Sequence, residues 1–186
     1  FDFAVKEGET IGVIGGTGSG KSTFVSLIAR LYDVTSGRIL YRGVDEKELK
    51  PEFIRGKIGF VPQKASLFEG SLRDNMKWGK EDATDEEIYQ ALDIAQAREF
   101  VDQKEQGLDF RIEQNGGNLS GGQKQRLTIA RALVRKPEIL ILDDSASALD
   151  FATDARLRKA IKENTENMTV FLVSQRVSTI RNADHI

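Results

Sequence analysis

The residues from Gly15 to Thr23 have the types and the spacing that hold phosphate groups. They fit the pattern G-x-x-x-x-G-K-S/T, in which glycines let the backbone fold closely around phosphates and direct its N–H groups inward. Lys21 is expected to reach the β- and γ-phosphates, and the Ser22 hydroxyl to help hold Mg²⁺. The residues predicted to bind the nucleotide phosphates are Gly15, Thr17, Gly18, Ser19, Gly20, Lys21, Ser22 and Thr23.

The segments on either side of this loop decide between two interpretations of it. The apolar run 10–14 predicts a strand and the run 24–29 predicts a helix, which is the strand–loop–helix context that a P-loop requires. The alternative is a glycine- and serine-rich turn that binds nothing. Lys21 followed by Ser22, together with the correct flanks, favours the phosphate-binding loop.

Polar side chains follow three further predicted strands directly. Gln63 comes after the apolar segment 57–61, Asp143 after 139–142, and Gln175 after 169–173. In a parallel sheet the carboxyl ends of the strands share one edge, so we expect these groups to meet the loop in one crevice. Asp143 has the position and the chemistry to hold Mg²⁺, directly or through water.

The order of the predicted elements indicates an α/β fold. Strands alternate with helices, so we predict a P-loop NTPase fold with a mainly parallel sheet flanked by helices. The RecA-like ATP-binding core is expected over 1–63 and 137–186, with an inserted, mainly helical subdomain over 64–136. Phe1–Val5 has the alternation of a strand interior, and 183–186 stops where another strand could begin. We therefore expect a fragment that lacks N- and C-terminal strands.

The composition narrows the classes of partner. Of the 186 residues, 39% are hydrophobic and 30% are charged, which is typical of a globular domain. The net charge of −2 gives no nucleic-acid footprint, so no nucleic-acid partner is expected. The absence of cysteine excludes disulfides and thiolate metal sites. No apolar run reaches membrane-spanning length, so other segments would have to supply any membrane part.

The run Leu119-Ser120-Gly121-Gly122-Gln123 adds a second kind of phosphate contact, because its serine and glycine N–H groups open a predicted helix. With this run, the chain resembles the nucleotide-binding domain of ATP-binding cassette (ABC) transporters over nearly its whole length. The matching pieces occur in the family's order, namely the P-loop at 15–23, Gln63, the signature at 119–123, the Walker B run 139–143, the D-loop stretch 147–150 and the switch position Gln175.

The resemblance implies a partner and a set of roles. In that family two nucleotide-binding domains meet head to tail, and ATP lies between one P-loop and the partner's signature. The implied catalytic residues are Asp144, Gln175 and Gln63, and the implied Mg²⁺ contacts are Ser22, Gln63 and Asp143. The signature residues that would serve the partner's ATP are Ser120, Gly121, Gly122 and Gln123. The D-loop residue is Asp150.

Two segments resemble exporters rather than importers. These are 66–75, which follows Gln63, and 112–118, which precedes the signature. The resemblance therefore implies a transmembrane domain in the same or an associated chain, and a position at the cytoplasmic face of a cell membrane.

Two positions depart from the family pattern. Asp144 stands where a glutamate usually polarises the attacking water, and its carboxylate is set back by one C–C bond, about 1.5 Å. Gln175 stands where a histidine usually contacts the γ-phosphate, and His185 lies too far along the chain to replace it. Both changes together resemble the degenerate subunit of heterodimeric ABC exporters, in which this P-loop would hold ATP while the signature serves hydrolysis at the partner's site.

Two alternatives remain open from the sequence. One is an ABC ATPase module without a transport role, of the kind found in DNA repair or translation. The other is a homodimeric exporter in which Asp144 and Gln175 suffice for hydrolysis. These motifs do not specify the transported substrate.

Overall fold

The computed structural model describes residues 2–186, which form two compact units. Unit 1 contains the chain up to Phe60, Pro137–Asp144 and Asn167–Ile186. Unit 2 contains Val61–Lys136 and Ser145–Glu166. Within residues 2–186, no helix combines the length and the apolar character needed to cross a bilayer.

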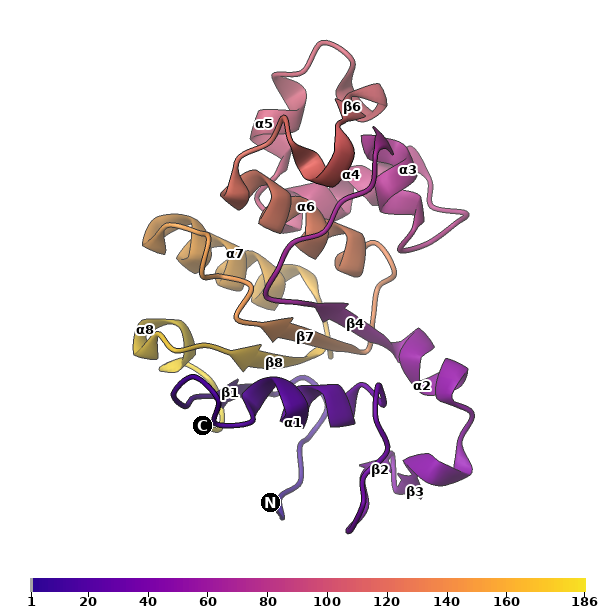
Figure 1. Ribbon diagram of the computed structural model, residues 1–186, viewed down its shortest axis with the longest axis vertical. Coiled ribbons are helices and arrows are strands. Elements are labelled where there is room, and N and C mark those ends of the chain that lie inside the picture. Colours follow the sequence, from indigo (N-terminus) through magenta and orange to yellow (C-terminus); the bar gives the residue numbers. More distant parts are fainter. Residues whose placement is uncertain (1) are drawn as a thin grey trace. The chain divides into compact units, whose positions relative to one another are not determined.

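Four short strands form the sheet of unit 1 (Figure 1). Its strand order is β1-β8-β7-β4, with β1 parallel to β8 and β8 parallel to β7. The strands are β1 (Thr10–Val13), β8 (Thr169–Val173), β7 (Ile139–Asp143) and β4 (Ile58–Val61). All five residues of β8 are buried, as expected for a strand with parallel neighbours on both sides. The predicted α/β fold with a parallel sheet is therefore confirmed.

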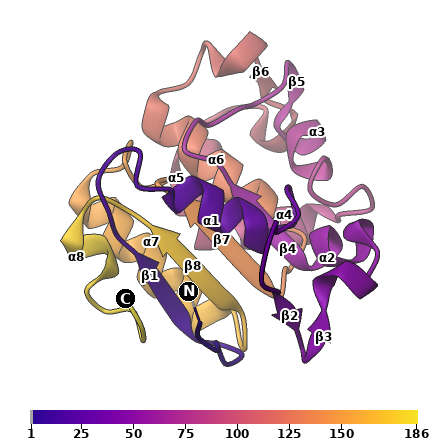
Figure 2. The ribbon, with the colours of Figure 1, turned by 60° about the horizontal axis from the view of Figure 1, so that its bottom comes forward.

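Helix α1 (Lys21–Ile28) covers one face of this sheet, as Figure 2 shows. Val25 is fully buried and joins a hydrophobic cluster with Ile141 of β7 and Phe171 of β8. Burial of side chains of this size contributes about 1.5–3 kcal/mol each. This packing fixes the start of α1, and with it the loop that precedes the helix.

The remaining elements of unit 1 include two that the sequence patterns did not predict, the helices α2 and α8. The elements are β2 (Leu40–Tyr41), β3 (Val44–Asp45), the 3₁₀ turn η1 (Glu46–Glu48), α2 (Pro51–Lys57) and α8 (Val177–Ile180). The strand expected at 38–41 is a two-residue strand that pairs with β3 in a hairpin. Residues 2–5 are not a strand, contrary to the alternation seen there, because no described strand pairs with them.

Unit 2 is mainly helical, with one short antiparallel pair of strands. Its elements are β5 (Gly70–Ser71), α3 (Leu72–Lys77), α4 (Asp85–Ile94), α5 (Arg98–Asp102), η2 (Gly107–Asp109), β6 (Arg111–Ile112), η3 (Gln114–Gly116), α6 (Gly121–Leu133) and α7 (Phe151–Asn164). Capping boxes begin α3, α4 and α6, and each uses a serine or threonine at the N-cap.

The unit boundaries differ from the predicted division in two places, and at one of them Val61–Gln63 belong to unit 2 although 1–63 was expected in the core. The segment Ser145–Glu166 belongs to unit 2, whereas all of 137–186 was expected in the core. The physical reason is packing, because α7 lies against α4 of the helical unit. The alternating order of strands and helices along the chain carries no information about this contact.

Candidate nucleotide-binding site

The strand register of unit 1 explains why residues far apart in sequence share one edge. Val13 pairs with Val173, and Val173 pairs with Asp143, so the last residues of β1, β8 and β7 form one row. The pairing continues one step further, since the Asp144 N–H donates to the Val173 carbonyl at 2.9 Å and the Ser174 N–H to the Val13 carbonyl at 3.1 Å. Three connecting segments therefore leave the sheet side by side.

The first of these segments is the glycine-rich loop. Gly18 and Gly20 have φ angles of +77° and +89°, in the left-handed region where a side chain is strained. A Cβ atom added at Gly16, Gly18 or Gly20 would meet no atom within 4 Å, so each glycine borders open space. Gly15 is different, because a Cβ there would lie 2.5 Å from the Ser19 hydroxyl. The loop is thus an open concavity with a tightly packed first residue.

Lys21 occupies this concavity. Its Nζ donates to the carbonyl oxygens of Gly15 and Gly16, both at 2.7 Å, and lies 3.4 Å from the Ser19 hydroxyl. These partners are backbone dipoles rather than a carboxylate. An anion entering the loop would therefore meet an ammonium group that no opposite charge neutralises in the loop.

The start of α1 adds backbone donors. Its N-cap is Gly20, which has no side chain to accept a hydrogen bond. Within residues 2–186 no acceptor receives the N–H groups of Lys21, Ser22 or Thr23. Three donors and the positive end of the helix dipole are the features that bind phosphate at helix starts.

Ser22 and Asp143 bring two oxygen ligands together. The Ser22 hydroxyl donates to Asp143 Oδ1 at 3.1 Å, and Asp143 is only 7% exposed. Mg²⁺ in nucleotide sites takes one or two protein oxygens and completes its shell with phosphates and water. The pair fits such an ion, since both oxygens stand at the edge of the phosphate-binding loop.

Asp144 follows Asp143 in an unusual backbone conformation, with φ at +48°. Aspartate tolerates this left-handed region better than most residues. Burial raises the pKa of the Asp144 carboxyl, and repulsion from Asp143 adds to the rise, while Arg176 and Lys21 oppose it. Arg176 was not among the predicted site residues, although its place directly after Gln175 was a usable signal.

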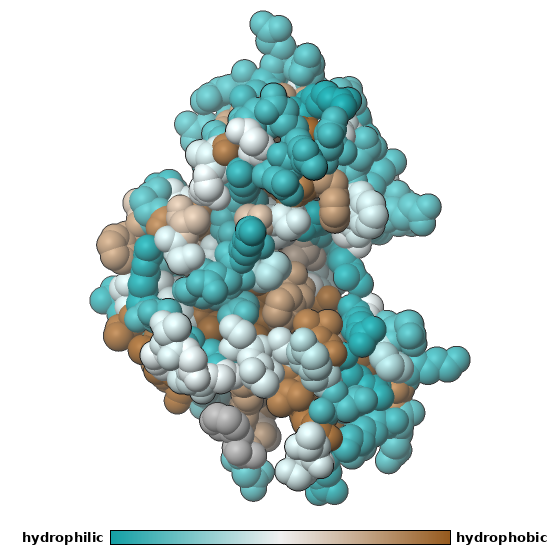
Figure 3. Space-filling model, viewed as in Figure 1, coloured by the Kyte–Doolittle hydropathy of each residue, from teal (hydrophilic) through white to brown (hydrophobic). Residues whose placement is uncertain are grey.

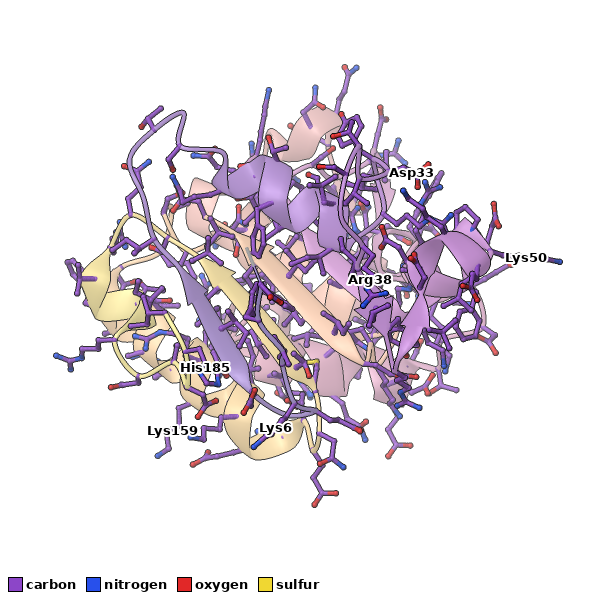
Figure 4. All side chains as sticks on the ribbon, turned by 90° about the horizontal axis from the view of Figure 1, so that it is seen from below. Lys6, Asp33, Arg38, Lys50, Lys159 and His185 are labelled. Atoms are coloured by element: carbon purple, nitrogen blue, oxygen red, sulfur yellow. The ribbon has the colours of Figure 1, made fainter. Side chains whose placement is uncertain are left out.

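Gln175 reaches the glycine-rich loop from the end of β8. Its side-chain Nε2 lies 3.5 Å from the Thr17 hydroxyl, at the long limit of a hydrogen bond. His185 is elsewhere, as expected. Its backbone pairs with Ile11 and Gly12, its ring lies 3.5 Å from Glu9, and Figure 4 shows it alongside β1.

A cavity of about 780 Å³ also lies in unit 1, but its lining does not suit a phosphate. Phe24, Leu27 and Ile28 of α1 line one side, and apolar side chains gather around α1 in the lower half of Figure 3. The lining carries more carboxyl groups (Asp2, Glu7, Glu46 and Glu138) than guanidinium groups (Arg38 and Arg42), and Arg42 is already paired with Glu138 at 3.0 Å. The glycine-rich loop, and not this cavity, is the candidate site.

Unit 2 carries the second element for which phosphate contact was predicted, at the start of α6. Ser120 is the N-cap, and its hydroxyl accepts from the Gln123 N–H at 3.2 Å while Gln123 Oε1 accepts from the Ser120 N–H at 2.9 Å. A Cβ at Gly122 would lie 3.3 Å from the Ala148 carbonyl, whereas a Cβ at Gly121 would meet nothing within 4 Å. The signature is thus a helix start with one open glycine.

Two other predicted site residues lie in unit 2. Asp150 is the N-cap of α7 and accepts from the Thr153 N–H and hydroxyl, both at 2.8 Å. These bonds lower the pKa of Asp150. Gln63 follows β4 by two residues. The structure therefore brings the P-loop, Asp143, Asp144 and Gln175 together in unit 1, and the signature and Asp150 in unit 2.

The fold and the loop define a P-loop nucleotide-binding protein. The pattern of a family described as "ABC transporter" matches residues 1–147 of the chain. The chain belongs to the ABC transporter family, and it corresponds to the family's ATP-binding domain.

Known relatives agree with this assignment. The chain is 45% identical over 186 residues to ABC transporter B family member 21 of Arabidopsis thaliana, and 48% identical over 187 residues to the uncharacterized ABC transporter ATP-binding protein YfiB of Bacillus subtilis. These alignments cover 100% and 99% of the chain, but only 14% and 32% of the relatives. The chain thus spans a third or less of their length.

A relative and a solved structure point to the exporter type. The β-(1→2)glucan export ATP-binding/permease protein NdvA of Bartonella bacilliformis is 43% identical over 182 residues, covering 98% of the chain and 31% of NdvA. The structure of a bacterial Atm1-family ABC exporter with ATP bound superposes with a TM-score of 0.89 at 35% identity, covering 96% of the chain and 31% of the exporter chain.

Proposed function

We propose that the chain is the ATP-driven motor domain of a heterodimeric ABC exporter, and that it hydrolyses ATP only weakly in its own site. ATP binding closes a head-to-tail pair of such domains, and hydrolysis at the partner's P-loop reopens the pair. The domain sits at the cytoplasmic face of a membrane, joined to a transmembrane domain. By function, we assign residues 1–63 and 137–186 to the ATP-binding core and 64–136 to the subdomain that carries the signature, a division that differs from the packing units at Val61–Gln63 and Ser145–Glu166.

The observation that carries the proposal is the pair of side chains beside the phosphate-binding loop. Asp144 and Gln175 both leave the strand ends that border the loop, and Gln175 approaches Thr17. Asp144 has a shorter side chain than glutamate, and misplacement of a reacting group by about 1 Å costs roughly a hundredfold in rate. Gln175 donates a hydrogen bond but cannot take up a proton. The site therefore has the groups to hold a triphosphate and poor groups to cleave it.

The remaining residues have binding roles. Lys21 and the N–H groups at the start of α1 bind the phosphates. Ser22, Asp143 and Gln63 contact Mg²⁺, which when bound neutralises phosphate charge. Ser120 and the glycine N–H groups of the signature face the partner's ATP, and Asp150 is the D-loop residue.

The test uses the full-length protein together with its partner subunit. Asp144→Glu combined with Gln175→His is expected to raise ATP turnover in this chain's own site, by up to about a hundredfold. Backbone strain reduces this gain in turnover, because glutamate adopts a φ of +48° less readily than aspartate does. Turnover is assigned to one site by disabling the partner's P-loop lysine, and a photo-crosslinking ATP analogue reports which chain holds nucleotide.

The matched control makes the same two chemical changes at exposed positions of unit 2, Asp82→Glu and Gln103→His. It is expected to leave turnover unchanged. Fast ATP hydrolysis in this chain's own unmodified site would contradict the proposal. Fast hydrolysis by this chain without a partner subunit would instead support the homodimeric exporter.

A further inference from the structure

The first turn of α6 is packed on one side and open on the other. A Cβ at Gly122 would lie 3.3 Å from the Ala148 carbonyl oxygen and 3.7 Å from Leu149 Cδ2, and Leu149 is only 4% exposed. A Cβ at Gly121 would meet no atom within 4 Å, and Gly121 is exposed. Residues four apart share one face of a helix, so Arg126 lies on the packed side with Gly122.

Arg126 connects this packed side to the end of α4. Its Nη1 donates to the Gln96 carbonyl at 2.7 Å, and its Nε donates to the Gly122 carbonyl at 3.3 Å. Gln96 directly follows the C-cap of α4, and α4 and α6 pack against each other within unit 2 (Figure 1). One guanidinium group therefore joins the carbonyl of the second glycine in the signature to the end of another helix.

The backbone of Gln96 is strained at the point that Arg126 contacts. Its φ is +59°, in the left-handed region, where a residue with a side chain costs about 1–2 kcal/mol. The Gln96 N–H donates to the Asp93 carbonyl at 3.1 Å and the Ala97 N–H to the Leu92 carbonyl at 2.8 Å, which is the Schellman pattern of a helix end. The bond from Arg126 offsets this strain, because a hydrogen bond to a charged group contributes about 1.5–3 kcal/mol.

The guanidinium of Arg126 is partly withdrawn from water. Burial lowers the pKa of Arg126, and the charges of Asp150 and Glu99 oppose this decrease, while that of Arg156 adds to it. The group lies 5.0 Å from the centre of the Phe100 ring, on α5. Withdrawing a cation from water is costly, so the contacts that compensate for it decide where the group lies. Those contacts come from α4, from α5 and from the first turn of α6.

We propose that Arg126 is a positioning residue for the signature. It holds the packed side of the first turn against the end of α4, so that Ser120 and the Gly121 N–H group meet the partner's ATP in one orientation. This inference rests on the proposed function, because it takes the signature as a contact for that ATP. Donors aimed at developing charge act only when they are held in place. A looser first turn therefore slows cleavage at the partner's site more than it weakens ATP binding there, which the partner's own P-loop provides.

The experiment compares Arg126→Met, which keeps much of the side chain's bulk, with Arg126→Lys, which keeps the charge and a donor. The matched control is Arg98→Met, since Arg98 also lies over an aromatic ring of unit 2, at 4.1 Å from Tyr89, but donates to Asp102 and not to α6. Two readouts are taken on the full-length protein with its partner. One is hydrogen exchange of the amides of 120–123, and the other is kcat and KM for ATP turnover.

Arg126→Met is expected to accelerate exchange in 120–123 and to lower kcat roughly tenfold, less than the roughly hundredfold cost of misplacing a reacting group by about 1 Å. KM should change little, because the lost interaction matters mainly in the transition state. Arg126→Lys is expected to restore part of both readouts, and Arg98→Met to change neither. In a Ser120→Ala background, Arg126→Met should lower kcat by a smaller factor, because both changes act through the same helix start.

The outcomes separate the two proposals. If Ser120→Ala leaves turnover unchanged, the role of the signature in the proposed function is wrong, and the inference falls with it. If Ser120→Ala lowers kcat but Arg126→Met does not, only the inference is overturned. It is also overturned if Arg126→Met lowers kcat by the same factor with and without Ser120, or if Arg126→Lys is as impaired as Arg126→Met.

Discussion

Two helices of this chain begin where phosphate is expected, and their starts are built differently. Helix α1 has Gly20 at its N-cap and no side-chain cap. Helix α6 has Ser120 at its N-cap, and Ser120 and Gln123 satisfy each other's backbone donors in a capping box. The start of α1 is therefore left open for a ligand, whereas part of the start of α6 is already satisfied by its own side chains.

The starts of α1 and α6 also differ in charge, and again the start of α1 is the one suited to a ligand. Lys21 is the first residue of α1 and bends into the loop, where its partners are neutral carbonyls. The first turn of α6 consists of Gly121, Gly122 and Gln123 and carries no charge. A triphosphate needs several cationic or N–H contacts. The α1 start can supply them alone, whereas under the proposed function the α6 start completes a site whose lysine comes from another subunit.

The largest difference between the two helix starts is expected in ATP binding, when a lysine near each start is replaced. Lys21→Met is expected to weaken ATP binding to this chain roughly a hundredfold, because charge-assisted hydrogen bonds are lost. Lys124→Met, at the fourth position of α6, should leave that binding unchanged. Titration with a fluorescent ATP analogue measures both. Comparable losses in the two variants would mean that the two starts are not specialised as described.

Glycine-to-alanine changes test the backbone side of the comparison. Gly20→Ala is expected to lower the free energy of unfolding by about 1–2 kcal/mol, because φ is +89° there. Gly121→Ala has no such strain and should be neutral, or stabilising by about 0.5 kcal/mol. Urea denaturation of the chain gives both values. Equal destabilisation would show that the α6 start is as constrained as the loop.

The sequence was sufficient for the architecture because its signals are local. The apolar runs that became β1, β7 and β8 were placed within a residue or two, and β8 was placed without error at Thr169–Val173. The loop chemistry was visible because glycine, lysine and serine stand at fixed spacing. The meeting of the loop, Asp143 and Gln175 followed from the carboxyl-end rule for parallel strands, and the register confirms it within unit 1.

Other features depend on contacts between distant residues and could not be predicted. The packing of α7 with the helical unit is set by its surface contact with α4, which no local pattern encodes. The left-handed backbone of Asp144 and the effect of Arg176 on its carboxyl arise only when β7 and β8 are paired. The contact between Arg131 and Ser66 spans 65 positions, and neither residue type signals it.

The capping box of α6 gives the next smaller effect. Ser120→Ala removes the acceptor for the Gln123 N–H and should cost about 1 kcal/mol of stability. ATP binding to this chain's own loop should stay unchanged, while turnover at the partner's site should fall. Ser120→Thr keeps a hydroxyl and serves as the control. If the alanine variant weakens binding in the chain's own loop, the two helix starts do not act on separate sites.

The smallest expected difference concerns the carboxyl groups, because the pKa values of Asp144 and Asp150 are shifted in opposite directions. Burial raises the pKa of Asp144 above 3.8, so its ionisation destabilises the fold. That penalty is absent well below pH 3.8 and complete above the raised pKa.

Hydrogen bonds from Thr153 lower the pKa of Asp150, so its charge stabilises the fold above pH 3.8. This stabilisation is lost as the pH falls through the lowered pKa. Asp144→Asn should therefore raise stability near neutral pH, and Asp150→Asn should lower it slightly, since asparagine keeps the cap but not the charge. Urea denaturation across a pH series measures both changes. The two variants should converge on the unmodified chain in acid, and a shift of the same sign in both at neutral pH would contradict the opposite roles of these carboxyl groups.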